Sequence, residues 1–158
     1  MPSLMPGMPG TKEVYGISVI REYLRIKIPP KAFERYGLTN GGLVVLTTTH
    51  KGEGGFALLN KKRTEAAVFE RYISQMSEID TVYWFNDKAY VLTQVSGGEL
   101  CLTPEILEAF HLRENDNLMV VKSTTVAMSY TPIEIWKEKF TKRGLYEAIE
   151  NMSKLEEF

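Results

Sequence analysis

Three cationic side chains alternate along one short stretch of the sequence: Arg21, Arg25 and Lys27. The arginine guanidinium carries paired donors that match phosphate oxygens and the edge of guanine in the major groove. If this stretch forms a hairpin, side chains at this spacing share one face of a two-stranded ribbon. The pattern therefore predicts either a surface that contacts nucleic acid or the solvated outer face of a sheet.

Two more cations follow on a predicted short helix. Lys31 and Arg35 lie four residues apart, which places them on one side of that helix. They could flank the same nucleic-acid groove, although a plain solvated helix surface is the favoured interpretation.

The residue pattern gives no support to a phosphate-binding loop, a metal site or catalysis. The glycines of residues 52–55 lack the Gly-Lys-Ser/Thr ending and the helix of a phosphate-binding loop, which favours a hairpin turn. His50 and His111 are a whole repeat apart and have no Cys or acidic residues at ligand spacing. We therefore expect no enzyme, no metal site and no cofactor.

Charge is distributed unevenly along the chain. Residues 21–71 contain ten Lys and Arg against five Glu, a net charge of +5, whereas the whole chain is −1, which leaves −6 for residues 72–158. Such asymmetry favours a polyanion-facing surface in the first half. The pI of about 6.2 is low for a dedicated DNA-binding domain.

An internal repeat determines which elements carry these residues. Residues 26–38 reappear in outline as residues 100–112, with Pro30 and Pro104 in register at an offset of 74. In each copy a strand runs into a proline and a short amphipathic helix, followed by a turn and an apolar strand. The repeat predicts a duplicated unit of strand, strand, short helix, strand, strand and longer helix.

Local signals predict where the helices begin and end. Thr103 can cap the second short helix through its hydroxyl, and Gly37 can end the first in the left-handed conformation. Thr131 and Glu134 have the spacing of a capping box for the C-terminal helix, which Gly144 interrupts.

Neither copy is large enough to bury a core alone, so the two are expected to share one. The predicted fold class is α+β, mainly β: a pseudo-twofold barrel of two half-barrels in one chain, each followed by a helix. The predicted organisation is a flexible tail at 1–13, a first repeat at 14–80, and a second repeat with the C-terminal helix at 81–158. No apolar run approaches ~20 residues, so no membrane span is predicted. The lone Cys101, expected buried or half-buried on a strand, favours a reducing cytoplasm.

The chain has more large apolar side chains than the core of one small barrel is expected to bury. An aromatic triplet puts at least one ring on each face of a strand, where the outer ring could stack on bases or, as we favour, contact another subunit. The terminal helix adds a second apolar face. The residues predicted to form an oligomer interface are Tyr83, Trp84, Phe85, Leu145, Ile149 and Met152.

The stretch 25–38, together with the strand at 41–45, resembles the swapped-hairpin half-barrel of the AbrB, MazE and SpoVT transcription factors. Two such units in one chain, each followed by a hairpin and a helix, look most like the MraZ branch. Residues 128–136 are similar to the strand-to-helix junction that closes a MraZ repeat. The resemblance covers roughly residues 14–140, and it implies a DNA surface on the hairpin before the Ile-Pro.

The sequence departs from the family's Asp-x-x-x-Arg pattern at that hairpin. Arg25 matches the family arginine, but Arg21 occupies the Asp position and Leu24 the position of the usual turn glycine. In the second copy the two positions hold Val95 and Glu99. The resemblance therefore assigns DNA contact to the first copy alone, to Arg25 and its cationic neighbours.

The leading hypothesis is a cytoplasmic, homo-oligomeric transcriptional regulator of the AbrB/MraZ type that contacts duplex DNA with the basic hairpin of the first repeat. The acidic second repeat would be free for a protein partner. The alternative is a protein-interaction or oligomerisation module on the same barrel that has lost DNA binding. An enzyme or ligand binder on a related barrel is a third class, which no residue pattern supports.

Overall fold

The computed structural model describes residues 14–49, 54–63, 70–124 and 126–158, so the predicted tail at 1–13 lies outside the described residues. The elements in chain order are β1 (Val14–Val19), η1 (Glu22–Leu24), β2 (Arg25–Lys27), α1 (Pro30–Arg35), β3 (Leu43–Thr48), β4 (Phe56–Asn60), η2 (Lys61–Arg63), α2 (Glu70–Ile73), β5 (Val82–Phe85), β6 (Lys88–Gln94), β7 (Glu99–Cys101), α3 (Pro104–Ala109), β8 (Asn117–Lys122), β9 (Ala127–Pro132), α4 (Ile133–Lys142) and α5 (Tyr146–Met152). The predicted α+β class, mainly strands, is confirmed.

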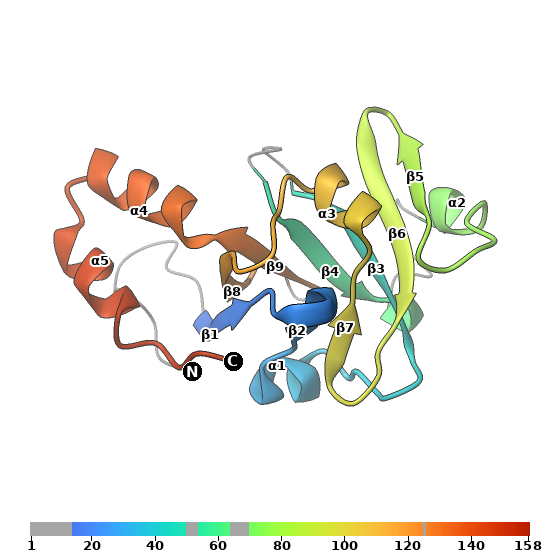
Figure 1. Ribbon diagram of the computed structural model, residues 1–158, viewed down its shortest axis with the longest axis horizontal. Helices are drawn as coiled ribbons and strands as arrows, with labels where there is room; N and C mark the ends of the chain where they lie inside the picture. Colours follow the sequence, from blue (N-terminus) through green and yellow to red (C-terminus); the bar gives the residue numbers. More distant parts are fainter. Residues whose placement is uncertain (1–13, 50–53, 64–69, 125) are drawn as a thin grey trace.

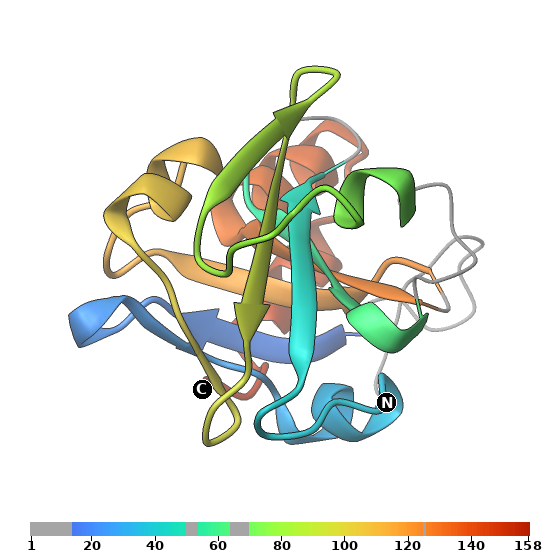
Figure 2. The same cartoon turned by 90° about the vertical axis from the view of Figure 1, so that its right-hand side faces the viewer.

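Seven strands form one antiparallel sheet in the order β1-β8-β9-β4-β3-β6-β5, and β2 and β7 form a separate two-stranded ribbon (Figure 1). β1 from the first copy pairs with β8 from the second, and β6 from the second pairs with β3 from the first. Figure 2 shows β3, β5 and β6 crossing steeply over β1, β8 and β9. The sheet therefore bends strongly and joins both halves of the chain.

The offset of 74 seen in the sequence also separates elements of the structure. It relates α1 to α3 and β3 to β8 at both ends of each element. In the ribbon, Ile26 lies directly opposite Leu100, again 74 positions away. The predicted short helices, and the strands that follow them, are confirmed in both copies.

One apolar core draws on both halves. Its largest cluster includes residues of β1, β3, β4, β6, β8 and β9, the two ribbon strands, α1 and α3. Tyr36, fully buried after α1, donates its hydroxyl proton to the Ala127 carbonyl oxygen at 3.1 Å. The Asn60 amide donates to the Tyr36 carbonyl oxygen at 3.0 Å. Tyr36 thus links α1 to β4 and to β9, and the core is shared between the two copies.

Most of the predicted helix ends are confirmed. Thr103 Oγ1 accepts a hydrogen bond from the Ile106 amide at 3.2 Å, and Gly37 is left-handed with φ of 63°. Gly144 separates α4 from α5 with φ of 69°. The capping box is wrong: α4 begins at Ile133 after Pro132 and has no side-chain cap hydrogen bond. Thr131 instead belongs to β9.

The helical hairpin α4–α5 covers the outer face of β1 and β8. Val14, Met119 and Val121 from these strands form a second buried cluster with Phe140 of α4 and residues of α5. Met152 is 1% exposed in this cluster, and the partly buried Leu145 and Ile149 pack against it. The terminal apolar face is therefore occupied within the chain, which removes Met152 as a surface contact.

Among the described helices, none has the length and apolar content needed to cross a membrane.

Candidate nucleic-acid interface

The three alternating cations lie around a tight turn between β1 and β2. The Arg21 amide donates to the Arg25 carbonyl oxygen at 2.8 Å, which makes these residues a directly opposed pair. Residues 22–24 form the turn, with Tyr23 and Leu24 left-handed at φ of 62° and 58°. Two arginines are thus held face to face at the end of a hairpin, where like charges repel each other unless an anion is nearby.

β2 presents its charged side chains to solvent because successive side chains of a strand point to opposite faces. Ile26 is fully buried, so its neighbours Arg25 and Lys27 point to solvent, and both are exposed. Lys27 lies opposite Glu99 of β7, which offsets part of its charge. Arg21 and Arg25 lie opposite each other at the end of this face, with Glu157 3.9 Å from Arg21 Nη2, and we call Arg21, Arg25 and Lys27 the cationic ribbon.

Hydrogen bonds from the core hold the backbone of the ribbon. The Lys27 carbonyl oxygen accepts from Ser18 Oγ at 2.8 Å and from the Tyr130 hydroxyl at 3.3 Å. Burial raises the pKa of Tyr130 well above its ordinary value, so the hydroxyl keeps its proton and remains a donor. These contacts fix the ribbon to β1 and β9, which keeps the exposed cations on a rigid support.

The helices beside the ribbon differ in charge. On α1, Lys31 and Arg35 are exposed, while Ala32 and Tyr36 face the core. On α3, which lies on the other side of the ribbon in Figure 1, the exposed residues include Glu105. Lys31 and Glu105 are 74 positions apart and therefore equivalent in the repeat. The predicted flanking cations are thus at the surface beside the ribbon, and only on the side of the first copy.

The corresponding turn of the second copy, residues 95–99, carries no cation. Val95, the equivalent of Arg21, is fully buried, and the turn is made by Gly97 and Gly98 at φ of 60° and 72°. Ser96 and Glu99 exchange both backbone hydrogen bonds at 3.1 Å, which closes a two-residue turn. The expectation that basic residues lie on the first hairpin alone agrees with this arrangement.

Tyr23 is a candidate contact that the sequence reasoning missed. Its side chain is 81% exposed at the tip of the hairpin, on a left-handed backbone that bulky residues rarely adopt. Such strain is concentrated at functional sites. In the sequence, this contact could have been predicted from an aromatic residue that lies between two arginines, because an aromatic ring can stack on a base or a sugar.

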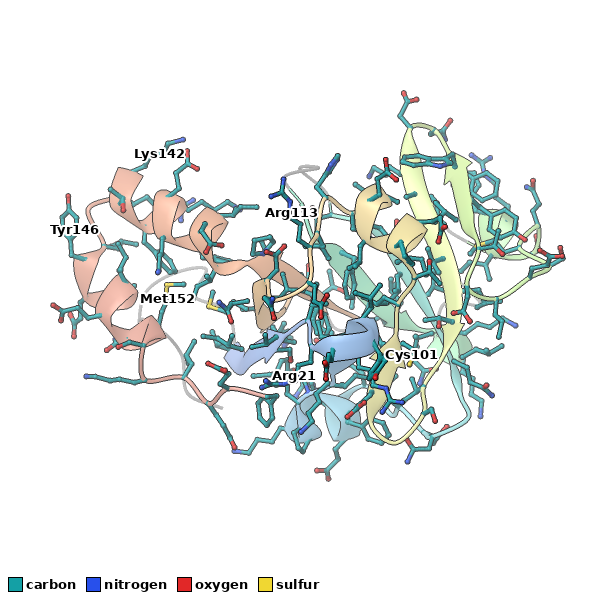
Figure 3. The ribbon with its side chains drawn as sticks, viewed as in Figure 1. Arg21, Cys101, Arg113, Lys142, Tyr146 and Met152 are labelled. Carbon is teal, nitrogen blue, oxygen red and sulfur yellow. The ribbon has the colours of Figure 1, made fainter. Side chains whose placement is uncertain are left out.

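Cys101 corrects one prediction, because its side chain is exposed and not buried or half-buried. It lies opposite Arg25 on the outer face of the ribbon. Figure 3 shows Arg21 and Cys101 near η1 and β7, away from Lys142 and Tyr146 on the α4–α5 hairpin. The thiol therefore lies on the candidate interface, where a thiol-specific reagent can report on its accessibility.

No metal site is formed by the residues that the structure describes, where no group of three His, Cys, Asp or Glu side chains is close enough. His111 is exposed, and His50 lies outside the described residues.

The predicted aromatic interface divides between two faces of β5. Tyr83 and Phe85 stack in parallel at 6.3 Å between ring centroids and pack against the cluster formed by β3, β6 and α2. Trp84 points the other way and is 60% exposed. β5 is also the last strand of the sheet. Trp84 is therefore the exposed member of the triplet, and Tyr83 and Phe85 are half-buried.

Searched against models of protein families, curated proteins and solved structures, the chain matches none.

Proposed function

We propose that this protein is a duplex-DNA-binding transcriptional regulator of the AbrB/MraZ type, which acts without catalysis in the cytoplasm and as a homo-oligomer. The observation that carries the proposal is the opposed pair Arg21 and Arg25 at the end of an exposed, well-anchored ribbon. Two guanidinium groups held together at a hairpin tip are a natural site for backbone phosphates. Lys27, Lys31 and Arg35 are exposed on β2 and α1, and we assign them to the same surface.

We further propose that the fold is a pseudo-twofold barrel of two swapped-hairpin half-barrels. Three observations support this: the offset of 74, the exchange of β1 and β6 between halves, and the pairing of β2 with β7. Leu24 adds to them, because it is left-handed at the position where the similar families have a turn glycine. The duplex would be contacted on one side only, since the second hairpin and α3 lack cations and expose Glu105 and Glu108.

A salt titration with random duplex DNA tests the proposal. If three to five cations contact phosphates, log Kd should change with log salt by a slope of about 3 to 4.5, because each neutralised phosphate contributes ~0.9. Fluorescence anisotropy of a labelled duplex at several salt concentrations gives this slope. A slope below about 1, or no binding at low salt, overturns the proposal.

A protein-interaction module is the second candidate function. Trp84, 60% exposed, and Ile79, 46% exposed, lie on or beside the edge strand β5, which pairs with β6 alone among the described strands. An exposed apolar edge strand is a ready surface for another chain. Both candidates include a homo-oligomer, so light scattering is combined with the salt titration. A Trp84→Ser variant that loses an oligomer formed by the parent, when the parent binds no duplex DNA, supports this candidate, and a parent mass near 18 kDa that does not change on tenfold concentration contradicts it.

A further inference from the structure

The C-terminal residues 156–158, which we call the C-terminal strap, lie along the outer edge of β1. The Ile17 amide donates to the Glu156 carbonyl oxygen at 2.8 Å, and the Phe158 amide donates to the Ile17 carbonyl oxygen at 2.7 Å. The Val19 amide donates to the Phe158 carbonyl oxygen at 3.3 Å. The strap thus pairs in parallel with β1 and covers the open edge of the sheet, beside α1 in Figure 1.

Gly16 allows this close approach. Its backbone has φ of 139°, and a Cβ there would lie 2.7 Å from the Glu156 carbonyl oxygen and 2.7 Å from the Phe158 ring. The register of β1 against β8 also shifts between Val14 and Gly16. A glycine at an irregular point of a strand marks a place where another backbone approaches closely. The edge of β1 is therefore shaped to receive the strap.

The docked strap brings carboxylates to the cationic ribbon. Glu157 Oε1 lies 3.9 Å from Arg21 Nη2, with the two side chains 61% and 50% exposed. Glu156 lines a groove of about 370 Å³ together with Lys31 and Lys154. The strap therefore reaches two of the five cations assigned to DNA contact, Arg21 through an ion pair and Lys31 through a shared groove.

We infer that the C-terminal strap is an intramolecular competitor that weakens DNA binding. The Glu157 carboxylate pairs with the Arg21 guanidinium, which would otherwise bind a phosphate of the DNA. This inference rests on the proposed function. The strap is held by backbone hydrogen bonds and the Phe158 ring, so its position does not depend on the Glu157 charge. An exposed ion pair is weak. The strap therefore tunes affinity and does not abolish binding.

The test compares two variants with the same change of charge, Glu157→Gln and Glu150→Gln. Glu150 is exposed on α5, away from the cationic ribbon. We expect Glu157→Gln to bind a random duplex roughly two- to fivefold more tightly than the parent at low salt, the range of an exposed ion pair. The Glu150→Gln control removes the same charge far from the ribbon. Its affinity should therefore stay within about 1.5-fold of the parent's, because only the long-range effect of the charge remains.

A double-mutant cycle then locates the effect. In an Arg21→Ala background, Glu157→Gln should no longer raise affinity, because its partner is gone. Slow amide exchange at Ile17 and Phe158 verifies that the strap stays docked in both variants. An increase in affinity that persists without Arg21 overturns the inference.

The outcomes separate this inference from the proposed function. If the parent binds DNA and Glu157→Gln binds equally well, the strap does not compete and the proposed function stands. If neither protein binds duplex DNA, both fall. Binding by the variant at a concentration where the parent shows none supports both.

Discussion

Replacement of the three cations of the ribbon by alanine should remove most of the DNA affinity while leaving the fold intact. Arg21, Arg25 and Lys27 are all exposed, and exposed substitutions change stability by no more than ~0.5 kcal/mol each. Loss of the opposed arginine pair also removes a repulsion. Urea unfolding of the triple variant should therefore give a midpoint close to that of the parent.

The expected loss of affinity follows from counterion release. Three lost phosphate contacts reduce the salt slope by about 2.7, which at 0.1 M salt corresponds to a loss of roughly 500-fold if the contacts contribute little at 1 M salt. The control is a second triple variant, Lys137→Ala, Lys142→Ala and Arg143→Ala, which removes exposed cations of α4 and its end. Both variants change the net charge from −1 to −4. Long-range repulsion is therefore similar in the two.

Anisotropy titrations of the parent and both variants, at several salt concentrations, measure the slope and the affinity together. We expect less than about a threefold change in the α4 control, since its cations lie away from the ribbon. If the ribbon variant keeps the parent's slope and affinity, or if both variants lose equally, the cationic ribbon is not the DNA surface.

Three other predictions use single groups. Because Cys101 is exposed opposite Arg25, random duplex DNA should slow its reaction with a maleimide at low salt, and an unchanged rate would place the DNA elsewhere. Tyr23→Asn should stabilise the protein by about 0.5–1 kcal/mol in urea unfolding, since asparagine tolerates the left-handed backbone at φ of 62° better than tyrosine; a destabilised variant would contradict the strain. The raised pKa of Tyr130 means that the native state holds this proton more tightly than the unfolded chain, so its contribution to stability is complete below pH 10.0 and falls as the pH rises further. Tyr130→Phe should flatten that alkaline decline in unfolding curves; equal declines would show that Tyr130 is not its cause.

Signals within a few residues of each other predicted local structure well. The hydroxyl of Thr103 and the missing side chain of Gly37 act on their own helix, so the outcome depends little on the rest of the chain. Thr131 shows where this fails. Its pairing with Met119 in the ladder of β8 and β9 extends the strand through the position of the expected cap. A long-range pairing, which no local pattern reports, decided where α4 begins.

Cys101 was wrongly expected to be buried or half-buried, although the pattern of its neighbours predicts that it is exposed. In a strand, successive side chains point to opposite faces. Leu100 is fully buried and Leu102 is 6% exposed, so the residue between them faces solvent. In a strand with one face in the core and one in solvent, a residue between two buried apolar residues is therefore expected to be exposed.

The partner of an apolar helix face could not be predicted from its spacing. The pattern of Leu145, Ile149 and Met152 correctly indicates a buried stripe, but it does not say whether another chain or the same chain covers it. The structure covers it with β1, β8 and α4. The exchange of β1 and β6 between the two halves has the same origin, because strand partners are chosen by the whole fold.

The candidate interface is one-sided because positions 74 residues apart differ in charge within one chain. At the offset of 74, the exposed Arg21 corresponds to the buried Val95, Arg25 corresponds to Glu99, and Lys31 of α1 corresponds to Glu105 of α3. A symmetric pair of identical chains would have to carry the same charges on both hairpins. The edges of the sheet diverge in the same way, since β6 is covered by β5 and its equivalent β1 is covered by the C-terminal strap. Residues 156–158 therefore lie beside the hairpin that carries Arg21 and Arg25, so the competition that we propose would act on that hairpin and not on its counterpart at residues 95–99.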